Sequence, residues 1–159
     1  MQIVTPCLWF KGDAEDAASF YVTLLPNSRI DRVLRSPADT PSGPTGSVLT
    51  VEFTLAGMKY VGLNGGPEFN FNEAVSFQIH CDDQKEVDRL WESLLDGGTE
   101  IACGWIKDRW GLAWQIVPVR LEELLRDPDP KRARRSMEAM MKMVKIDIAA
   151  LERAADGSN

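Results

Sequence analysis

The chain has 159 residues, which is long enough for one domain or for two small modules that share a core. Its hydrophobic fraction of 44% and charged fraction of 26% are ordinary for a globular protein, and its net charge of -6 argues against a nucleic-acid binder, which usually presents a basic face. Three cysteines without a pairing pattern, no signal peptide and no apolar run long enough for a membrane span predict a cytoplasmic protein.

The first module is expected to cover residues 1–68. A short apolar segment, IVTPCLWF, predicts a strand in which Pro6 favours an edge position or a bulge. A helix follows, with Asp13 as its cap, an apolar face at helical spacing and a stop at Pro26. Strands are then predicted in SRIDRVLRS, SVLTVEFTLAG and MKYVGLNGG, so the module has the order β-α-β-β-β.

The same order recurs in the second module, residues 73–119. A strand is predicted in AVSFQIHCDD, and further strands in TEIACGWIKD and GLAWQIVPV. The clearest helix of the chain is DQKEVDRLWESLLDGG, in which Asp83 followed by Glu86 resembles a capping box and apolar residues recur at helical spacing. The third strand of this module is left open, because few residues separate Gly98 from Arg109. An offset of seventy residues places Asp13 on Asp83 and superimposes the apolar faces of the two helices, which indicates two similar modules packed together.

Residues 120–156 are predicted to form a helical tail. Asp129 followed by Pro130 is a good helix start. An apolar stripe of Met137, Met140, Met141 and Val144 is interpreted as a cover for the sheet or for a dimer partner, with a Met-rich binding groove as the alternative.

The module used twice and ending in DRWGLAWQIVP resembles the vicinal oxygen chelate superfamily, which includes glyoxalase I, extradiol dioxygenases and bleomycin- and fosfomycin-resistance proteins. TPCLWFKGDAEDAASFYVTLLPNSRI, CGWIKDRWGLAWQIVP and the tail RDPDPKRARRSMEAMMKMVKIDIAALERA resemble its PhnB-like branch, the 3-demethylubiquinone-9 3-methyltransferase-like domain. The resemblance implies an α+β fold in which two modules form a curved mixed sheet around a concave pocket. With the helical tail, residues 1–159 are expected to make a single domain.

Enzymes of the superfamily usually hold a divalent metal through His and Glu on the first and last strands of each module. At the matching positions this chain has Thr5 or Pro6, a residue within 61–64, Ser76 and Gln115, and none of them is a histidine or a carboxylate. A catalytic metal needs about three nitrogen or carboxylate ligands. We therefore expect neither a metal nor another cofactor.

The stretch CGWIKDRWGLAWQIVP holds three of the five tryptophans, beside three charged residues. Aromatic side chains with a few polar groups suit a small-molecule pocket, and core packing is an equally strong interpretation for each tryptophan taken singly. His80, the only histidine, is better explained by a structural or surface role than as a general base. The candidate pocket residues are Trp9, Asn64, Gln78, Cys103, Trp105, Lys107, Trp114 and Gln115.

Two functions remain open from the sequence. The first is metal-independent binding of a small molecule, and the second is an enzyme of the superfamily, of the lyase, dioxygenase or transferase type, acting on a small substrate. The methyltransferase name gains no support, because the chain lacks the Gly-rich loop and doubly wound pattern of common S-adenosylmethionine enzymes. A homodimer is expected, since the fold exposes edge strands and apolar sheet surface that a second copy covers, while nucleic-acid and membrane partners are not.

Overall fold

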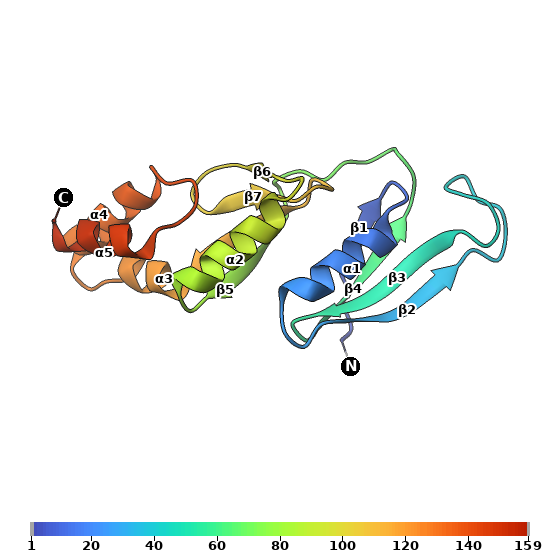
Figure 1. Ribbon diagram of the computed structural model, residues 1–159, viewed down its shortest axis with the longest axis horizontal. Helices are drawn as coiled ribbons and strands as arrows, with labels where there is room; N and C mark the ends of the chain where they lie inside the picture. Colours follow the sequence, from blue (N-terminus) through green and yellow to red (C-terminus); the bar gives the residue numbers. More distant parts are fainter. Residues whose placement is uncertain (1, 159) are drawn as a thin grey trace. The chain divides into compact units, whose positions relative to one another are not determined.

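The computed structural model describes residues 2–158, which divide into two compact units, one ending at Phe71 and the other beginning at Asn72. Each unit holds one four-stranded mixed sheet and follows the order β-α-β-β-β, and the second unit continues into helices (Figure 1). The α+β fold of two repeated modules with a helical tail is therefore confirmed. No helix in the described part of the chain is both long and apolar enough to cross a membrane.

The first unit has its strands in the order β1-β4-β3-β2. β1 pairs with β4 in parallel and lies at an edge, as Pro6 predicted, while the other neighbours are antiparallel. The elements of the unit are β1 (Cys7–Phe10), α1 (Ala14–Leu24), β2 (Arg29–Arg35), β3 (Val48–Leu55) and β4 (Met58–Asn64).

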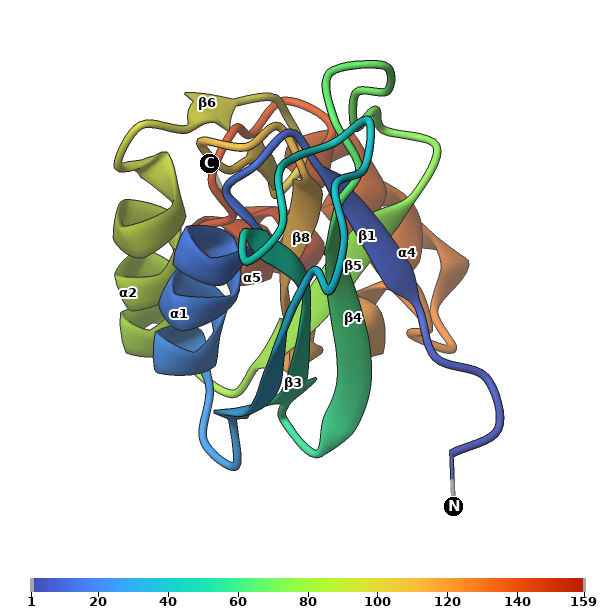
Figure 2. The same ribbon diagram turned by 90° about the vertical axis from the view of Figure 1, so that its right-hand side faces the viewer.

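Helix α1 packs on one face of this sheet, as Figure 2 shows for strands β3 and β4. Tyr21 of the helix is fully buried beside Phe53, which stacks on Tyr60 with ring centroids 5.5 Å apart. Gly62 permits the close approach of helix and sheet, because a Cβ added there would lie 3.2 Å from the Cβ of Ala14. Among the described residues of this unit, no helix covers the opposite face.

The start of α1 is capped from a distant strand. Asp13 occupies the N-cap position, but its side chain makes no capping hydrogen bond, so the expected cap is wrong. Asn64 at the end of β4 accepts instead from the backbone N–H of Ala14 (2.9 Å) and donates to the carbonyl of Val48 (3.0 Å). One amide thus satisfies backbone groups of a helix and a strand.

The second unit has the strand order β5-β8-β7-β6. Its helix begins at the offset of seventy from Ala14, and Asp83 caps it by accepting from the N–H of Glu86 (2.8 Å), as predicted. The third strand of this module, which the sequence left open, is the two-residue β6. The elements are β5 (Ser76–Cys81), α2 (Gln84–Leu95), β6 (Thr99–Glu100), β7 (Trp105–Lys107) and β8 (Ala113–Pro118).

The core of this unit lies between α2 and one face of its sheet. From Trp114 onward burial alternates along β8, so that Trp114 and Ile116 are fully buried while Gln115 between them is not. The helix contributes the residues that repeat at helical spacing, and the buried set is Val87, Leu90, Trp91, Leu94, Ile79, Cys81, Ile106, Trp114 and Ile116.

A buried carboxylate builds the turn between β7 and β8. Asp108 is 4% exposed, and its side chain accepts from the N–H groups of Trp110 (2.9 Å) and Leu112 (3.0 Å) and from the indole of Trp114 (2.9 Å). The neighbouring Arg109 points outward to Asp96 at 2.6 Å. The charged residues of this stretch therefore have separate roles, with Asp108 inside and Arg109 on the surface.

The tail forms three helices, α3 (Val119–Leu125), α4 (Pro130–Met140) and α5 (Ile148–Asp156), gathered where β8 ends (Figure 1). Asp129 caps α4 ahead of Pro130, as expected. The helices enclose a small core of their own, made of Leu121, Leu124, Ile146, Leu151 and Ala155. Met140 of the stripe packs against this core, whereas Met137 and Met141 are 40% and 57% exposed and do not.

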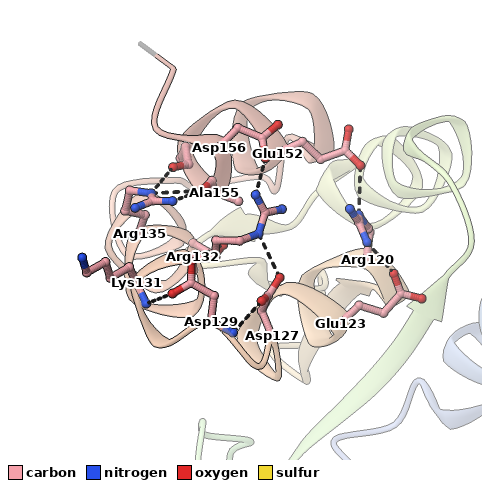
Figure 3. Close-up of polar contacts among 12 residues, drawn as sticks. Arg120, Glu123, Asp127, Asp129, Lys131, Arg132, Arg135, Glu152, Ala155 and Asp156 are labelled. Atoms are coloured by element: carbon pink, nitrogen blue, oxygen red, sulfur yellow. Dashed lines mark hydrogen bonds and ion pairs between the residues drawn. The ribbon is translucent and has the colours of Figure 1, made fainter.

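Ion pairs join the three tail helices, as Figure 3 shows. Arg120 of α3 reaches Glu152 of α5 at 2.9 Å. Arg132 of α4 pairs with Asp127 before the helix (3.0 Å) and with Asp156 of α5. Because these groups are partly exposed, their main effect is to fix the relative positions of helices that the apolar core already holds together.

We expect Asp108→Ala to lower the free energy of unfolding by about 3 kcal/mol, because two backbone N–H groups and one indole N–H lose a buried charged acceptor. Asp96→Ala removes a carboxylate from the same region, but one that is 81% exposed, and should cost less than about 1 kcal/mol. Urea denaturation followed by circular dichroism compares the two. Equal midpoints would contradict the structural role of Asp108.

Candidate functional site

The sheet of the second unit presents a face that α2 does not cover. Strand pairing places Trp105, Gln115 and Gln78 in one row across β7, β8 and β5, and Lys107, Ala113 and Ser76 in the next. Within each strand these residues alternate with those packed under α2, so they point to the side away from α2, although the small Ala113 is itself fully buried. We call this surface the open face, and its polar and aromatic members are Ser76, Gln78, Trp105, Lys107 and Gln115.

A chain of hydrogen bonds runs along the open face. The amide of Gln78 donates to the side-chain oxygen of Gln115 (3.0 Å), and the amide of Gln115 donates to the hydroxyl of Ser76 (2.8 Å). The three side chains hold one another in fixed positions. The hydroxyl of Ser76 retains its proton for donation, and each amide NH₂ has a second N–H. The three linked side chains therefore offer neutral hydrogen-bond donors.

Lys107 adds a positive charge to this surface. Its ammonium lies 2.5 Å from the carboxylate of Glu73, in the segment before β5. The hydrogen bond from Lys107 lowers the pKa of Glu73 below its ordinary value of 4.5. Because the pKa of Glu73 is lowered, its ion pair with Lys107 persists at neutral pH. The pair is lost only in acid, when the pH falls through that lowered pKa and Glu73 takes up a proton.

Two of the expected pocket residues lie on the helix-packed sides of their sheets. Trp114 is fully buried and donates to Asp108, and Asn64 is 6% exposed and caps α1. Their polar groups are engaged in the fold. The open face therefore includes fewer of the candidate pocket residues than the sequence predicts.

Trp9 lies in the first unit and anchors the chain after β4. Its half-buried indole donates to the carbonyl of Gly66 (2.9 Å), and its ring meets Phe69 edge-on at 4.9 Å. A Cβ added at Gly65 would come within 2.3 Å of the indole, so only glycine fits under the ring. These contacts give Trp9 a structural role on its own sheet.

Two of the cysteines and the histidine lie in the second unit. Burial raises the pKa of Cys81 to about 12, so its thiol stays protonated. Cys103 is half-buried in the turn before Trp105. The Nδ1 of His80 lies 3.5 Å from Glu122 of α3, at the end of the open face.

Glu73 was missed by sequence reasoning, because nothing in its own segment indicated a partner more than thirty positions away. Its place directly before a predicted strand was the one available signal. Across residues 2–158, no three His, Cys, Asp or Glu side chains come together in a group that could hold a metal ion.

We expect Trp114→Phe to destabilise the fold by about 2 kcal/mol, since the change leaves Asp108 without one buried donor and opens a cavity. Trp105→Phe alters a half-buried ring and should cost less than about 1 kcal/mol. Thermal denaturation of the two variants provides the measurement. A larger loss in the Trp105 variant would mean that the two tryptophans have been assigned to the wrong sides of the sheet.

Comparison with known proteins connects this fold with a family. The family model described as 3-demethylubiquinone-9 3-methyltransferase matches residues 2–117. The PhnB protein of Bacillus cereus is 28% identical, and the match covers 74% of this chain and 100% of that one with a TM-score of 0.67. No curated protein matches the chain in sequence.

More distant solved structures share the fold alone. Protein PA1353 from Pseudomonas aeruginosa is 19% identical with a TM-score of 0.61, over 74% of this chain and 98% of that chain. The fosfomycin resistance protein FosX of Listeria monocytogenes, solved with Mn(II) and sulfate, is 15% identical with a TM-score of 0.53, over 79% and 95%.

The family match ends at residue 117, so the resemblance of the tail seen in the sequence lies outside it. The matched part includes nearly all of both modules and the whole open face. The chain belongs to the 3-demethylubiquinone-9 3-methyltransferase (PhnB) family, and its two modules have the vicinal oxygen chelate fold.

Proposed function

We propose that this protein binds a small organic molecule at the open face of its second sheet without a catalytic metal. The observation that carries the proposal is the chain of hydrogen bonds that links Gln78, Gln115 and Ser76. Ser76 and Gln115 match positions at which metalloenzymes of the superfamily carry metal ligands. Here the two side chains bond to each other and supply neutral donors.

The donor set does not fit a divalent metal such as the manganese named with FosX. The oxygen of Gln115 already accepts from Gln78, and that of Ser76 accepts from Gln115. Neutral amide and hydroxyl oxygens also offset the dehydration of a transition-metal ion poorly compared with His and Glu. Recognition by hydrogen bonds suits these residues better than chelation.

The remaining groups indicate the chemistry of the ligand. The half-buried indole of Trp105 offers a flat apolar surface in the same row as Gln115. Lys107 adds a cation whose charge Glu73 partly offsets. An aromatic molecule with an anionic or carbonyl group is the ligand class that these neighbours would recognise.

The alternative is an enzyme of the superfamily whose catalytic groups lie elsewhere. The family name would suggest methyl transfer, but each four-stranded mixed sheet lacks the doubly wound parallel arrangement typical of common S-adenosylmethionine enzymes. Binding that saturates without turnover of the bound molecule would separate the two functions.

Fluorescence titration with 8-anilinonaphthalene-1-sulfonate, an aromatic anion, tests the proposed face. Lys107→Gln should weaken binding about fivefold, and Glu73→Gln should strengthen it by a similar factor, because the two changes alter the local charge in opposite directions. Trp105→Ala should weaken binding about tenfold through the lost ring contact. Lys131→Gln, on the exposed surface of α4, is the matched control. Lys107→Gln and Glu73→Gln titrations that coincide with that control would refute the site.

Elemental analysis of protein purified without chelators or an affinity tag tests metal independence. We expect well below one equivalent of zinc, iron, nickel or manganese per chain. His80→Ala should leave the metal content unchanged, because its imidazole faces Glu122 and no cluster of ligands. A stoichiometric metal lost on this substitution would place the protein among the metalloenzymes.

We also propose a homodimer, since edge strands and a sheet face that α2 leaves open favour burial by a second copy. Light scattering at micromolar concentration should give about twice the chain mass of 17.7 kDa. A monomer mass under these conditions would contradict the dimer. The cytoplasmic location stays a prediction from the sequence.

A further inference from the structure

The segment between α4 and α5 crosses the second unit from α2 to the turn before β7. We call residues 141–147 the strap. Lys145 pairs with Asp88 of α2 at 2.6 Å. The side chain of Gln84, also in α2, donates to the carbonyl of Ile146 (3.0 Å) and accepts from the N–H of Ile148 (2.9 Å). The strap is thus anchored along one side of α2.

The other side of the strap holds the turn that leads into the open face. The N–H groups of Cys103 and Gly104 donate to the carbonyls of Met143 and Val144, both at 2.8 Å. The carbonyl of Gly104 in turn accepts from the N–H of Ile116 in β8 (2.8 Å). Gly104 therefore joins the strap to the sheet directly before Trp105.

This turn has an unfavourable backbone conformation. Cys103 has φ of 56° and Gly104 φ of 83°, and a non-glycine residue in the left-handed region costs about 1–2 kcal/mol. Such a conformation persists only where surrounding contacts fix it. A Cβ added at Gly104 would lie 3.1 Å from Ile146, so the strap also packs closely against the turn.

We infer that the C-terminal tail is a positioning element for the ligand-binding face, acting through the strap on Cys103, Gly104 and hence Trp105. The inference rests on the proposed function for its ligand, but the positioning of residues 103–105 by the strap is argued from the strap's own contacts. Because the family match ends at residue 117, the strap lies outside the part of the chain shared with the family. A chain with the strap released would retain both sheets and lose the fixed orientation of Trp105.

Hydrogen exchange measured by mass spectrometry on the full chain tests whether the strap fixes the turn before β7. The double variant Gln84→Ala/Lys145→Ala removes the anchors on α2 without touching the turn, and Ile146→Ala removes the packing contact. In both variants we expect amides of residues 102–105 to exchange at least tenfold faster. Arg132→Ala breaks ion pairs between the tail helices but leaves the strap contacts, and should not change this segment.

Titration with 8-anilinonaphthalene-1-sulfonate tests the link to binding. If the turn is ordered about a tenth of the time after release, the apparent dissociation constant should rise about tenfold. Lys145→Arg in the presence of wild-type Gln84 retains the pair with Asp88 and should bind like the wild type. Unchanged exchange in both release variants would overturn the inference. Faster exchange with unchanged affinity would overturn the link to the ligand, and absence of probe binding to the wild type would count against the proposed function alone.

Discussion

The second unit depends on the carboxylate of Asp108, which is buried and accepts hydrogen bonds from two backbone N–H groups and from Trp114. These bonds close the turn between β7 and β8 and thereby set the register in which Trp105 lies opposite Gln115. A shift by one residue would exchange the two faces of β8 and bring Gln115 into the core. The positions of Trp105 and Lys107 relative to Gln115 on the open face follow from that register.

Much of the fold could be predicted because its determinants are local. The helical spacing of the α2 residues and the cap at Asp83 need only a few neighbouring positions, and both agree with the structure. The alternation of side chains along a strand likewise places Trp114 and Gln115 on opposite faces, but it does not say which face is covered. The repeat at seventy residues then extended these local patterns to the whole pair of modules.

The remaining features depend on partners that are far apart in the sequence. Glu73 meets Lys107, and Gln78 meets Gln115, only after strands β5 and β8 have paired. The role of the tail was hidden for the same reason, since its contacts with Cys103 and Gly104 are made by backbone carbonyls that carry no side-chain signal. Sequence patterns report which residues are apolar, but they do not report which polar groups will meet.

The two helices of the repeated modules also differ in when they can be completed during synthesis. The cap of α2 is the residue before it, so its first turn can be satisfied as soon as the segment leaves the ribosome. Helix α1 takes its cap from Asn64, fifty residues later in the chain, and must wait for β4. Non-local contacts of this kind slow folding, because the entropy of loop closure is lost before the contact forms. We therefore expect the later-synthesised helix to be the more autonomous one, and the N-terminal module to acquire its native helix only after its whole sheet has been made.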